Sequence, residues 1–366
     1  MQELQLFLGT NLNPSNPISY PHRRKNILTG DWILVSPHRT QRPWQGEVAP
    51  VLPAYRPQYD PQCYLCPGNK RANGDVNPQY DSTFVFTNDY SSLLMDIPAD
   101  PPEKNPLLQS KGERGICRVV NFSPRHDLTL AEMSEEEIRN VITVWQKEYS
   151  ALSKNPHIKY VQIFENKGSM MGNSNPHPHC QIWAQESIPM EPAKELHQFS
   201  RYYAKTKRSL LSDYLKTELK SKERIVYENS AFVAVVPFWA VWPYETMIIS
   251  RRKIGSLHQF KDEERSAFAN IIGAITAKYD NLFETSFPYS SGLHQSPTDG
   301  KDHPEWHFHM HFYPPLLRSA QVKKFMVGYE MMAEPQRDST PEQSAKILRE
   351  LSSSHYKYNN ASNERK

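Results

Sequence analysis

Two histidines one residue apart, His177 and His179, are the side chains of this sequence best suited to nucleophilic chemistry. Prolines before and between them fix φ and remove backbone donors, and a β-prone segment follows. Side chains alternate along a strand, so His179 and Gln181 share one face while Cys180 and Ile182 face the core. An isolated pair of this kind is more often an incidental feature of a surface loop, so the interpretation depends on the rest of the chain.

A second group of potential ligands is the pair Cys63 and Cys66, in a knuckle-like turn. Two thiolates at this spacing bind one tetrahedral zinc ion when two further ligands complete the site. The chain has no second C-x-x-C, so histidines must complete a zinc site here, and His126 and His177 are the candidates. Redox chemistry is the alternative for such a pair, although the surroundings lack the βαβ pattern of thioredoxin-like proteins.

A row of three histidines, His307, His309 and His311, follows nearer the end of the chain. On a strand these three share one face, and burying them is costly unless something binds them. A divalent metal ion is the usual partner of such a cluster, and His294 and Glu195 could supply further ligands. The competing interpretation is a row that only lines the core, as single buried histidines often do.

The elements around these histidines form an internal repeat. Two predicted amphipathic helices, the first starting at the N-cap Ser134, share one spacing of apolar residues and lie 130 residues apart. The matching positions are Ile138, Val141, Ile142, Trp145, Tyr149 and Leu152 in the first copy and Phe268, Ile271, Ile272, Ile275, Tyr279 and Leu282 in the second. The same offset takes His177 and His179 to His307 and His309. The sequence therefore predicts two copies of one strand-strand-helix-strand unit, each ending in an H-x-H strand.

Composition excludes several classes of protein. The net charge of +3 over 366 residues gives no electrostatic ground for bulk binding of nucleic acid or membranes. No stretch approaches the about 20 apolar residues of a membrane span, and the first residues lack signal-peptide features. Four cysteines in a chain of this length do not indicate a secreted disulfide framework. We therefore expect a soluble, cytoplasmic protein with neither nucleic acid nor a membrane as partner.

Any phosphate group must be held without a glycine-rich loop. Neither G-x-x-x-x-G-K-[ST] nor G-x-G-x-x-G after a strand occurs, and the chain has 14 glycines against 30 prolines. Arg39 and Arg42 lie just after a short predicted strand at 32–36, where planar guanidinium groups can clamp a phosphate. Two solvated loop arginines are the alternative.

Taken together, these motifs resemble the galactose-1-phosphate uridylyltransferase family of the histidine-triad superfamily. The match preserves order and spacing from about residue 20 to residue 350. It comprises Arg39-x-x-Arg42-Pro43-Trp44, Phe86-Thr87-Asn88-Asp89, Glu165-Asn166-Lys167-Gly168, Ser174-Asn175-Pro176-His177-Pro178-His179-x-Gln181-Ile182-Trp183, His309-x-His311-Phe312-Tyr313-Pro314-Pro315 and Lys324-Phe325-x-Val327-Gly328-Tyr329-Glu330.

The expected fold is α+β, with two histidine-triad-like repeats that form one largely antiparallel sheet, a half-barrel with helices packed against it. We expect an N-terminal arm over residues 1–20, a first half over 21–195, a second half over 196–352 and a flexible tail over 353–366. The charged segment 194–224 between the halves predicts one covering helix and a linker.

The resemblance implies transfer of UMP from UDP-glucose to galactose 1-phosphate, giving UDP-galactose and glucose 1-phosphate. His179 matches the nucleophile of the family and would hold the uridylyl group between two displacements. A neutral imidazole can attack phosphorus without a separate strong base. Gln181 and Ser174 could donate hydrogen bonds to phosphoryl oxygens as charge develops.

Further roles are implied by matching positions only. Arg39 and Arg42 would steady the phosphates, while Phe86, Asn88 and Asn166 would hold uridine. A homodimer is implied, because the hexose would be approached from the neighbouring subunit. The positions that would bind the hexose in this way are Lys324, Phe325, Val327, Gly328, Tyr329, Glu330 and Gln336.

The resemblance also implies two metal sites. A zinc site would be formed by Cys63, Cys66, His126 and His177, and a second site, for Fe2+ or Zn2+, by Glu195, His294, His309 and His311. His307 receives no role. On one regular strand, ligand His177 and nucleophile His179 would lie about 7 Å apart on one face, so either zinc is near the active site or the strand begins after His177. Pro178 favours the second arrangement.

Two other functions compete with this interpretation. A nucleotidyl hydrolase or dinucleoside-polyphosphate phosphorylase of the same superfamily would pass the nucleotide to water or phosphate and turn over without hexose phosphate. A zinc-dependent binding module would use its Cys and His clusters as scaffolding only. Gln181 and the arginine pair argue against the module, because a scaffold does not need them.

Overall fold

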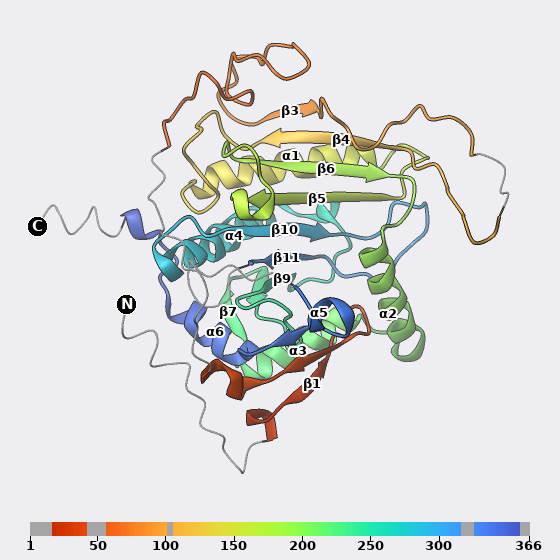
Figure 1. Ribbon diagram of the computed structural model, residues 1–366, viewed down its shortest axis with the longest axis vertical. Helices are drawn as coiled ribbons and strands as arrows, with labels where there is room; N and C mark the ends of the chain where they lie inside the picture. The colour runs from red at the N-terminus through yellow and green to blue at the C-terminus, as the bar shows by residue number, and fades with distance from the viewer. Residues whose placement is uncertain (1–16, 42–55, 101–104, 316–325, 359–366) are drawn as a thin grey trace, which may run out of the picture.

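The computed structural model describes residues 17–41, 56–100, 105–315 and 326–358, and it confirms an α+β fold (Figure 1). Its centre is a nine-stranded sheet with edges β3 and β7, and every pairing between neighbours in it is antiparallel. The spatial order is β3 (Phe84–Thr87), β4 (Gly115–Asn121), β6 (His179–Gln185), β5 (Tyr160–Lys167), β10 (Tyr289–His294), β11 (His309–Tyr313), β9 (Thr246–Ser250), β8 (Phe232–Val235) and β7 (Ile225–Glu228).

The repeat predicted from the sequence is present in three dimensions, but two strands follow each helix where we predict one. The first copy is β4, α1 (Glu135–Leu152), β5 and β6, and the second is β9, α4 (Asp262–Phe283), β10 and β11. The two copies meet where β5 pairs with β10, and the order β4-β6-β5 is mirrored by β10-β11-β9. Strands β6 and β11, each of which begins at the second histidine of an H-x-H pair, therefore occupy equivalent places on either side of the centre.

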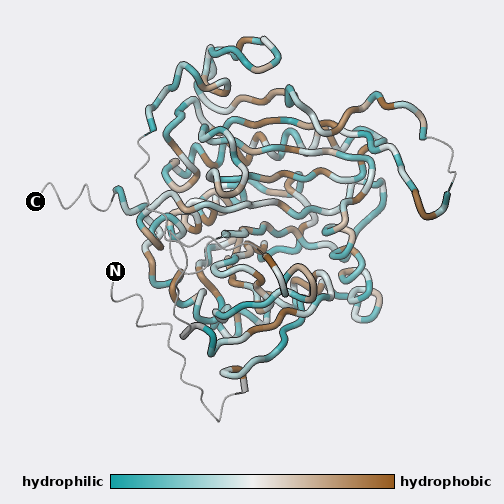
Figure 2. The backbone as a smooth tube through the Cα atoms, in the orientation of Figure 1, coloured by the Kyte–Doolittle hydropathy of each residue, from teal (hydrophilic) through white to brown (hydrophobic). Residues whose placement is uncertain are grey.

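Helices α1 and α4 cover one face of this sheet (Figure 1). The predicted N-cap is confirmed: Ser134 and Glu137 form a capping box at the start of α1. The apolar stripes of both helices are buried against inward-facing strand residues such as Ile163 and Ile182. Burying one such side chain stabilises the fold by about 1.5–3 kcal/mol, and Figure 2 shows apolar residues along strands and helices with hydrophilic loops around them.

The opposite face is covered by a second apolar cluster over the second half, and over β3 and β4 by the residues around Cys63 and Cys66. Phe232 and Ala234 of β8 enter the core below α1 and α4, whereas Val233 and Val235 enter a second cluster with Phe199 and other residues. Strands β7 to β9 are thus buried on both sides. On β6 the residues that alternate with the buried ones stay partly exposed, which leaves that face of β6 accessible.

Segment 194–224 contains two helices instead of the single covering helix that we predict. These are α2 (Met190–Thr206) and α3 (Leu210–Ser221). The left-handed Lys207, with φ of 58°, ends α2, and Ser209 accepts a hydrogen bond from the amide of Ser212 as the N-cap of α3. A continuous charged pattern conceals this break, because a serine cap and a left-handed lysine leave little trace in hydropathy.

A small second sheet packs beside the main one. Its order is β1 (His22–Lys25), β2 (Trp32–Val35) and β12 (Gln336–Arg337), with β12 parallel to β2. The remaining helices are η2 (Pro17–Ser19), η3 (Pro37–Gln41), η4 (Ser169–Met171), η5 (Leu257–Gln259), α5 (Tyr329–Met332) and α6 (Pro341–Glu350).

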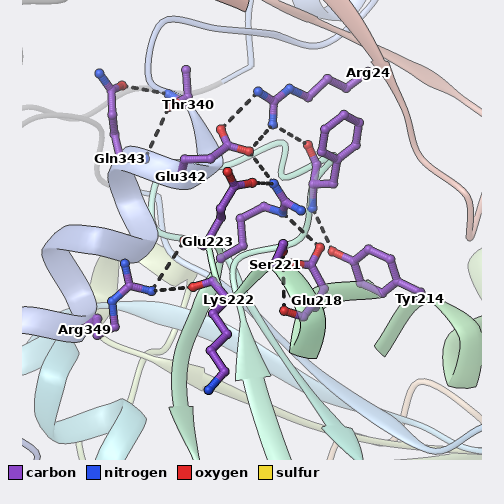
Figure 3. A network of polar contacts seen from close by, with 12 residues as sticks. Arg24, Tyr214, Glu218, Ser221, Lys222, Glu223, Thr340, Glu342, Gln343 and Arg349 are labelled. Atoms are coloured by element: carbon purple, nitrogen blue, oxygen red, sulfur yellow. Dashed lines mark hydrogen bonds and ion pairs between the residues drawn. The ribbon is translucent and has the colours of Figure 1, made fainter. Parts of the chain in front are cut away.

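An ion-pair network fastens the ends of the chain to the second half (Figure 3). Glu342 of α6 accepts from Arg24 of β1 at 2.8 Å and from Arg224 at 2.7 Å. Arg224 also donates to the buried Glu218 of α3 at 2.9 Å. The Arg24 guanidinium lies over the ring of Phe238, 4.4 Å from its centroid. The network therefore joins β1, α3 and α6, which are far apart in sequence.

Part of the tail over residues 353–366, which we predict to be flexible, makes specific contacts with the second half. His355 is buried and its Nε2 lies 3.3 Å from Oδ2 of Asp280 on α4. Asn281 donates to the carbonyls of Ser352 and Ser354 and accepts from the amide of Tyr356. The polar composition of the tail conceals these specific contacts, and residues 359–366 lie outside the described part of the chain.

Candidate active site and metal sites

His179 is the first residue of β6, so His177 lies outside the strand, as Pro178 leads us to expect. The ring Nδ1 of His179 lies 2.7 Å from the carbonyl oxygen of His177. A carbonyl only accepts, so Nδ1 carries the proton and donates, and Nε2 keeps its lone pair. Burial lowers the pKa of His179, which keeps the ring neutral. The geometry thus presents Nε2 of His179 as an unprotonated nucleophile.

Gln181 follows on the same face of β6. Its Oε1 accepts from Nε1 of Trp183 at 3.0 Å and from Nδ2 of Asn88 at 3.4 Å. Both donors occupy the carbonyl side of the amide, so the amide nitrogen of Gln181 is left to donate elsewhere. Asn88 also accepts from the amide of Tyr90. This arrangement provides an oriented hydrogen-bond donor two residues from His179, on the same face of β6.

An open pocket surrounds these two residues. Residues that line it are Phe164, Asn166, Gly172, Asn173, Ser174, His179, Cys180 and Gln181. Asn166, near the end of β5, accepts from the hydroxyl of Ser290 at 2.7 Å through its Oδ1, so its Nδ2 remains available as a donor. The pocket therefore combines one imidazole with amide and hydroxyl groups and no carboxylate, a lining suited to an anionic ligand.

Cys63, Cys66, His126 and His177 come together as one buried cluster whose candidate ligand atoms all lie within 4.8 Å of one another. Sγ of Cys66 lies 3.6 Å from Nδ1 of His126 and 3.5 Å from Nδ1 of His177. Two thiols and two imidazoles within this distance form the donor set of a tetrahedral zinc site. The residues fit the ion that the resemblance implies.

The protonation states also fit a cation at this place. Burial lowers the pKa of His177 to about 3 and lowers that of His126, so both rings are neutral ligands. Burial raises the pKa of the Cys66 thiol to about 12, so a thiolate there needs a positive charge beside it. Nε2 of His177 donates to the carbonyl oxygen of Ser123 at 2.9 Å, which leaves Nδ1 to bind.

Outer contacts hold this cluster in place, and sequence reasoning missed them. The amide of His177 donates to Oδ1 of Asn175, whose side chain also lies 3.4 Å from Sγ of Cys63. The hydroxyl of Tyr80 lies 3.1 Å from Nε2 of His177 and donates to the carbonyl of Leu65. Only Asn175 stands inside a motif, and Tyr80 carries no sequence signal at all.

Glu195 of α2 meets His294, His309 and His311 in a second cluster, again with candidate ligand atoms within 4.8 Å. Oε1 of Glu195 lies 2.9 Å from Nδ1 of His294, and Oε2 lies 3.3 Å from Nε2 of His309. Of the three histidines that we predict on one strand face, only His309 and His311 lie on β11 and belong to this cluster, whereas His307 precedes the strand. The cluster thus joins β11 to the adjacent strand β10 and to helix α2. One carboxylate and three imidazoles are donors that first-row divalent metals accept.

The buried polar atoms of this second cluster also favour a bound metal ion. Among the described residues, Oε2 of Glu195, Nε2 of His309 and both ring nitrogens of His311 are buried and make no well-aligned hydrogen bond, although Oε2 of Glu195 faces Nε2 of His309 at 3.3 Å. Such burial is costly unless something binds these atoms. Burial lowers the pKa of His311 to about 3. For Glu195 burial acts to raise the pKa, but the facing His294 and His309 outweigh it and hold the pKa well below its usual value. A divalent cation fits this donor set.

His307 occupies the place of His177 in the second copy, yet it faces no thiol. Its Nδ1 lies 3.1 Å from the hydroxyl of Ser212, and its Nε2 donates to the carbonyl of Ser250 at 2.7 Å. The carbonyl of His307 accepts from Nδ1 of His309 at 2.8 Å. The same backbone contact thus fixes the tautomer of His309 here and of His179 in the first copy.

The other predicted phosphate and uridine residues are placed as follows. Phe86 of β3 is buried beside the Cys63 cluster, and the pairing of Phe86 with Val119 and of Val119 with Gln181 puts it on the Gln181 face. Arg39 lies 3.4 Å from Asp338. Arg42, Lys324 and Phe325 lie outside the described residues.

The remaining predicted substrate residues gather elsewhere. Val327, Gly328, Tyr329, Glu330 and Gln336 belong to α5, β12 and the residues beside them, and none of them lines the His179 pocket. In Figure 1, α5 lies beyond β9 while β6 lies on the other side of the centre of the sheet. Among the described residues of one chain, these two groups are separate.

The chain matches the family model for the galactose-1-phosphate uridyl transferase N-terminal domain over residues 10–189 and the model for its C-terminal domain over residues 195–360. The chain belongs to the galactose-1-phosphate uridylyltransferase family. Galactose-1-phosphate uridylyltransferase from Haemophilus influenzae is 51% identical over 341 residues, covering 93% of this chain and 97% of its own. That from Saccharomyces cerevisiae is 49% identical over 347 residues, covering 91% and 95%.

Solved structures agree with the fold. A uridylyltransferase structure matches with a TM-score of 0.72 and 27% identity, over 89% of this chain and 97% of its own. An ADP-glucose phosphorylase from Arabidopsis thaliana with bound ADP-glucose matches in fold, with a TM-score of 0.71 and 24% identity, over 91% and 99%. This member of the galactose-1-phosphate uridylyltransferase family is thus a nucleotidyltransferase, and its family implies UDP-sugar and hexose-1-phosphate substrates. No helix among the described residues is long and apolar enough to cross a membrane.

Proposed function

We propose that this uridylyltransferase works by double displacement through a uridylyl group held on Nε2 of His179. The observation that carries the proposal is the 2.7 Å contact between Nδ1 of His179 and the carbonyl of His177, which leaves Nε2 unprotonated at the pocket. A covalent intermediate lets one site serve two similar sugar phosphates in turn.

In the first step Nε2 of His179 attacks the α-phosphorus of UDP-glucose. The N–P bond forms while the bond from the α-phosphorus to the bridging oxygen breaks, and glucose 1-phosphate leaves with the electron pair. Gln181 donates its amide N–H to an α-phosphoryl oxygen, and Ser174 donates its hydroxyl. In the second step a phosphate oxygen of galactose 1-phosphate attacks the same phosphorus and the N–P bond breaks. UDP-galactose then departs, and His179 is neutral again.

Binding of the nucleotide is assigned to the residues around this pair. Asn166 and Asn88 hold uridine beside Phe86, and Arg39 and Arg42 hold the phosphates. The hexose is bound by the group around α5, from Lys324 to Gln336, which reaches the pocket from the second subunit of a homodimer. The separation of that group from the His179 pocket within one chain supports this arrangement.

The two clusters are proposed as structural metal sites. Zinc held by Cys63, Cys66, His126 and His177 would stabilise the thiolates and fix the carbonyl that orients His179. A second divalent ion, Fe2+ or Zn2+, would bind Glu195, His294, His309 and His311 and anchor α2 to β10 and β11. Neither ion takes part in a bond that changes during the reaction.

The test uses UDP-glucose labelled in the α-phosphate without acceptor, followed by denaturation. We expect label on the chain as an acid-labile, base-stable adduct that His179→Ala abolishes and that galactose 1-phosphate discharges as UDP-galactose. His157→Ala, at an exposed histidine, is the matched control and keeps the adduct. Label found only as free UMP would indicate a hydrolase, and unchanged UDP-glucose with no adduct would indicate a binding protein.

A further inference from the structure

The C-terminal segment 352–358 makes hydrogen bonds with Asp280 and Asn281, two neighbouring residues near the end of α4. Asn281 makes three hydrogen bonds with the backbone of this segment, of 2.7 to 2.9 Å. The neighbouring Asp280 faces the buried ring of His355 at 3.3 Å. Beyond His355, Lys357 and Tyr358 contact Glu132 at 2.6 and 2.7 Å. These contacts form a clasp, the name used below for residues 352–358.

The tautomer of His355 decides which group donates in its hydrogen bond with Asp280. The amide of Lys357 donates to Nδ1 of His355 at 3.3 Å, so Nδ1 has no proton and Nε2 carries it. Nε2 therefore donates to Oδ2 of Asp280. The other oxygen of Asp280 accepts from Nζ of Lys167 at 2.7 Å and from the amide of Phe287 at 2.8 Å. Asp280 is thus a fully bound carboxylate with the clasp on one side and Lys167 on the other.

Lys167 is the last residue of β5, and its side chain is only 5% exposed. A buried ammonium group of this kind depends on its partner, because an unpaired buried charge is strongly unfavourable. Nζ of Lys167 also lies over the ring of Tyr289 on β10, 5.4 Å from its centroid. The end of β5 is therefore held from the helix side by Asp280, and Asp280 in turn by the clasp.

The residue before Lys167 faces the reaction site. Strand alternation turns Asn166 to the other face, where it lines the pocket of His179 and accepts from Ser290. Gly168 follows with φ of 88° and leads through η4 to the pocket residues Gly172 and Ser174. Displacement of Lys167 would therefore move one wall of the pocket.

We propose that the clasp, through His355, Asp280 and Lys167, positions Asn166 and so sets the affinity of the site for uridine nucleotides. These three are positioning residues, since none of them lines the pocket. The inference rests on the proposed role of Asn166 in uridine binding. It assigns the C-terminal segment a part in substrate recognition at a site built from β5 and β6.

The test compares UDP binding by calorimetry to the full chain, a chain ending at Leu351 and a chain ending at Tyr358. We expect UDP to bind about tenfold more weakly to the chain ending at Leu351, the loss that one misplaced hydrogen-bond donor produces. The chain ending at Tyr358 keeps the clasp and binds as the full chain does. In turnover, KM for UDP-glucose rises in the shorter chain, whereas the rate at which galactose 1-phosphate discharges a preformed adduct is unchanged.

A point variant keeps the inference testable if the chain ending at Leu351 does not fold. His355→Phe retains an aromatic ring but removes the donor to Asp280, and we expect UDP binding about threefold weaker. Equal UDP affinity in His355→Phe and the full chain would overturn the inference while leaving the proposed function intact. A full chain that neither binds UDP nor forms the adduct would overturn both.

Discussion

The indole Nε1 of Trp183 donates to Oε1 of Gln181 at 3.0 Å, between two residues on the same face of β6. This contact decides which end of the Gln181 amide faces the pocket. With Asn88 also on the oxygen, the nitrogen remains to donate to a phosphoryl oxygen. Trp183 is thus part of the site although its ring carries no chemistry of its own.

Gln181→Glu should lower kcat by a factor of about 100 to 1000, the usual loss for one transition-state donor. The change replaces an N–H donor by an oxygen and adds a negative charge beside the phosphates. Rapid-quench measurement of adduct formation on His179 would give the rate of the first displacement. Trp183→Phe removes only the orienting N–H, so we expect a reduction of several-fold. If Gln181→Glu formed the adduct at the normal rate, Gln181 would have no part in catalysis.

Cys66→Ser should remove one metal ion per chain and lower kcat by about 10 to 100-fold, as loss of supporting contacts around a metal does. The reason is that His177 would bind the ion through Nδ1, while its carbonyl oxygen accepts from Nδ1 of His179. Elemental analysis and turnover on the same preparation would check this. Treatment with a chelator should lower kcat in the same way while it removes the ions of both clusters.

Cys117→Ser is the matched control for that variant. Cys117 is a buried free thiol on β4 and does not belong to the cluster. It should retain the metal content of the unchanged chain, even if its stability falls. Full activity of Cys66→Ser without the ion would show that His179 is ordered by the protein alone.

The main features of this fold were readable from the sequence because they rest on local periodicity. The offset of 130 residues and the cap at Ser134 predict the paired α1 and α4 and two equivalent strands at the H-x-H pairs. The structure contains them, although each strand begins only at the second histidine of its pair. Alternation likewise places Gln181 beside His179. Such signals need only neighbours along the chain.

Features that depend on distant backbone contacts could not be read in this way. β12 has two residues and pairs with β2, about 300 residues earlier, without any hydrophobic pattern. The carbonyls of Ser123 and Ser250 that orient His177 and His307 could belong to any residue type. The ligand sets of the two clusters came from the family resemblance, and only their proximity is visible in the structure.

Glu342→Gln should lower the free energy of unfolding by about 3 kcal/mol, because it leaves Arg24 and Arg224 with too few counterions in a largely buried place. The side chain of Arg24 is 1% exposed and that of Arg224 is 9% exposed. Urea unfolding at pH 7 would measure the change. Glu223→Gln removes an exposed partner of the same Arg224. It should lower the free energy of unfolding by about 1 kcal/mol at most. Equal effects of the two variants would contradict the network.

Glu165 should contribute a loss of stability as the pH rises from about 4.5 to about 7. Burial raises the pKa of this carboxyl from 4.5 to about 7, although Lys167 acts in the opposite direction. The fold therefore favours the neutral acid. Its contribution is complete below pH 4.5, the value in the unfolded chain, and is lost as the pH rises through about 7.

Glu165→Gln keeps the neutral shape, so its unfolding free energy should depend less on pH between 5 and 8. The difference from the unchanged chain should grow by about 3 kcal/mol in favour of the variant across this range. Part of the slope should persist, since burial also raises the pKa of Glu245 to about 7. Urea unfolding at several pH values would measure it, with Glu136→Gln at an exposed position as control. Parallel curves for Glu165→Gln and the unchanged chain would mean that Glu165 stays ionised, held by Lys167.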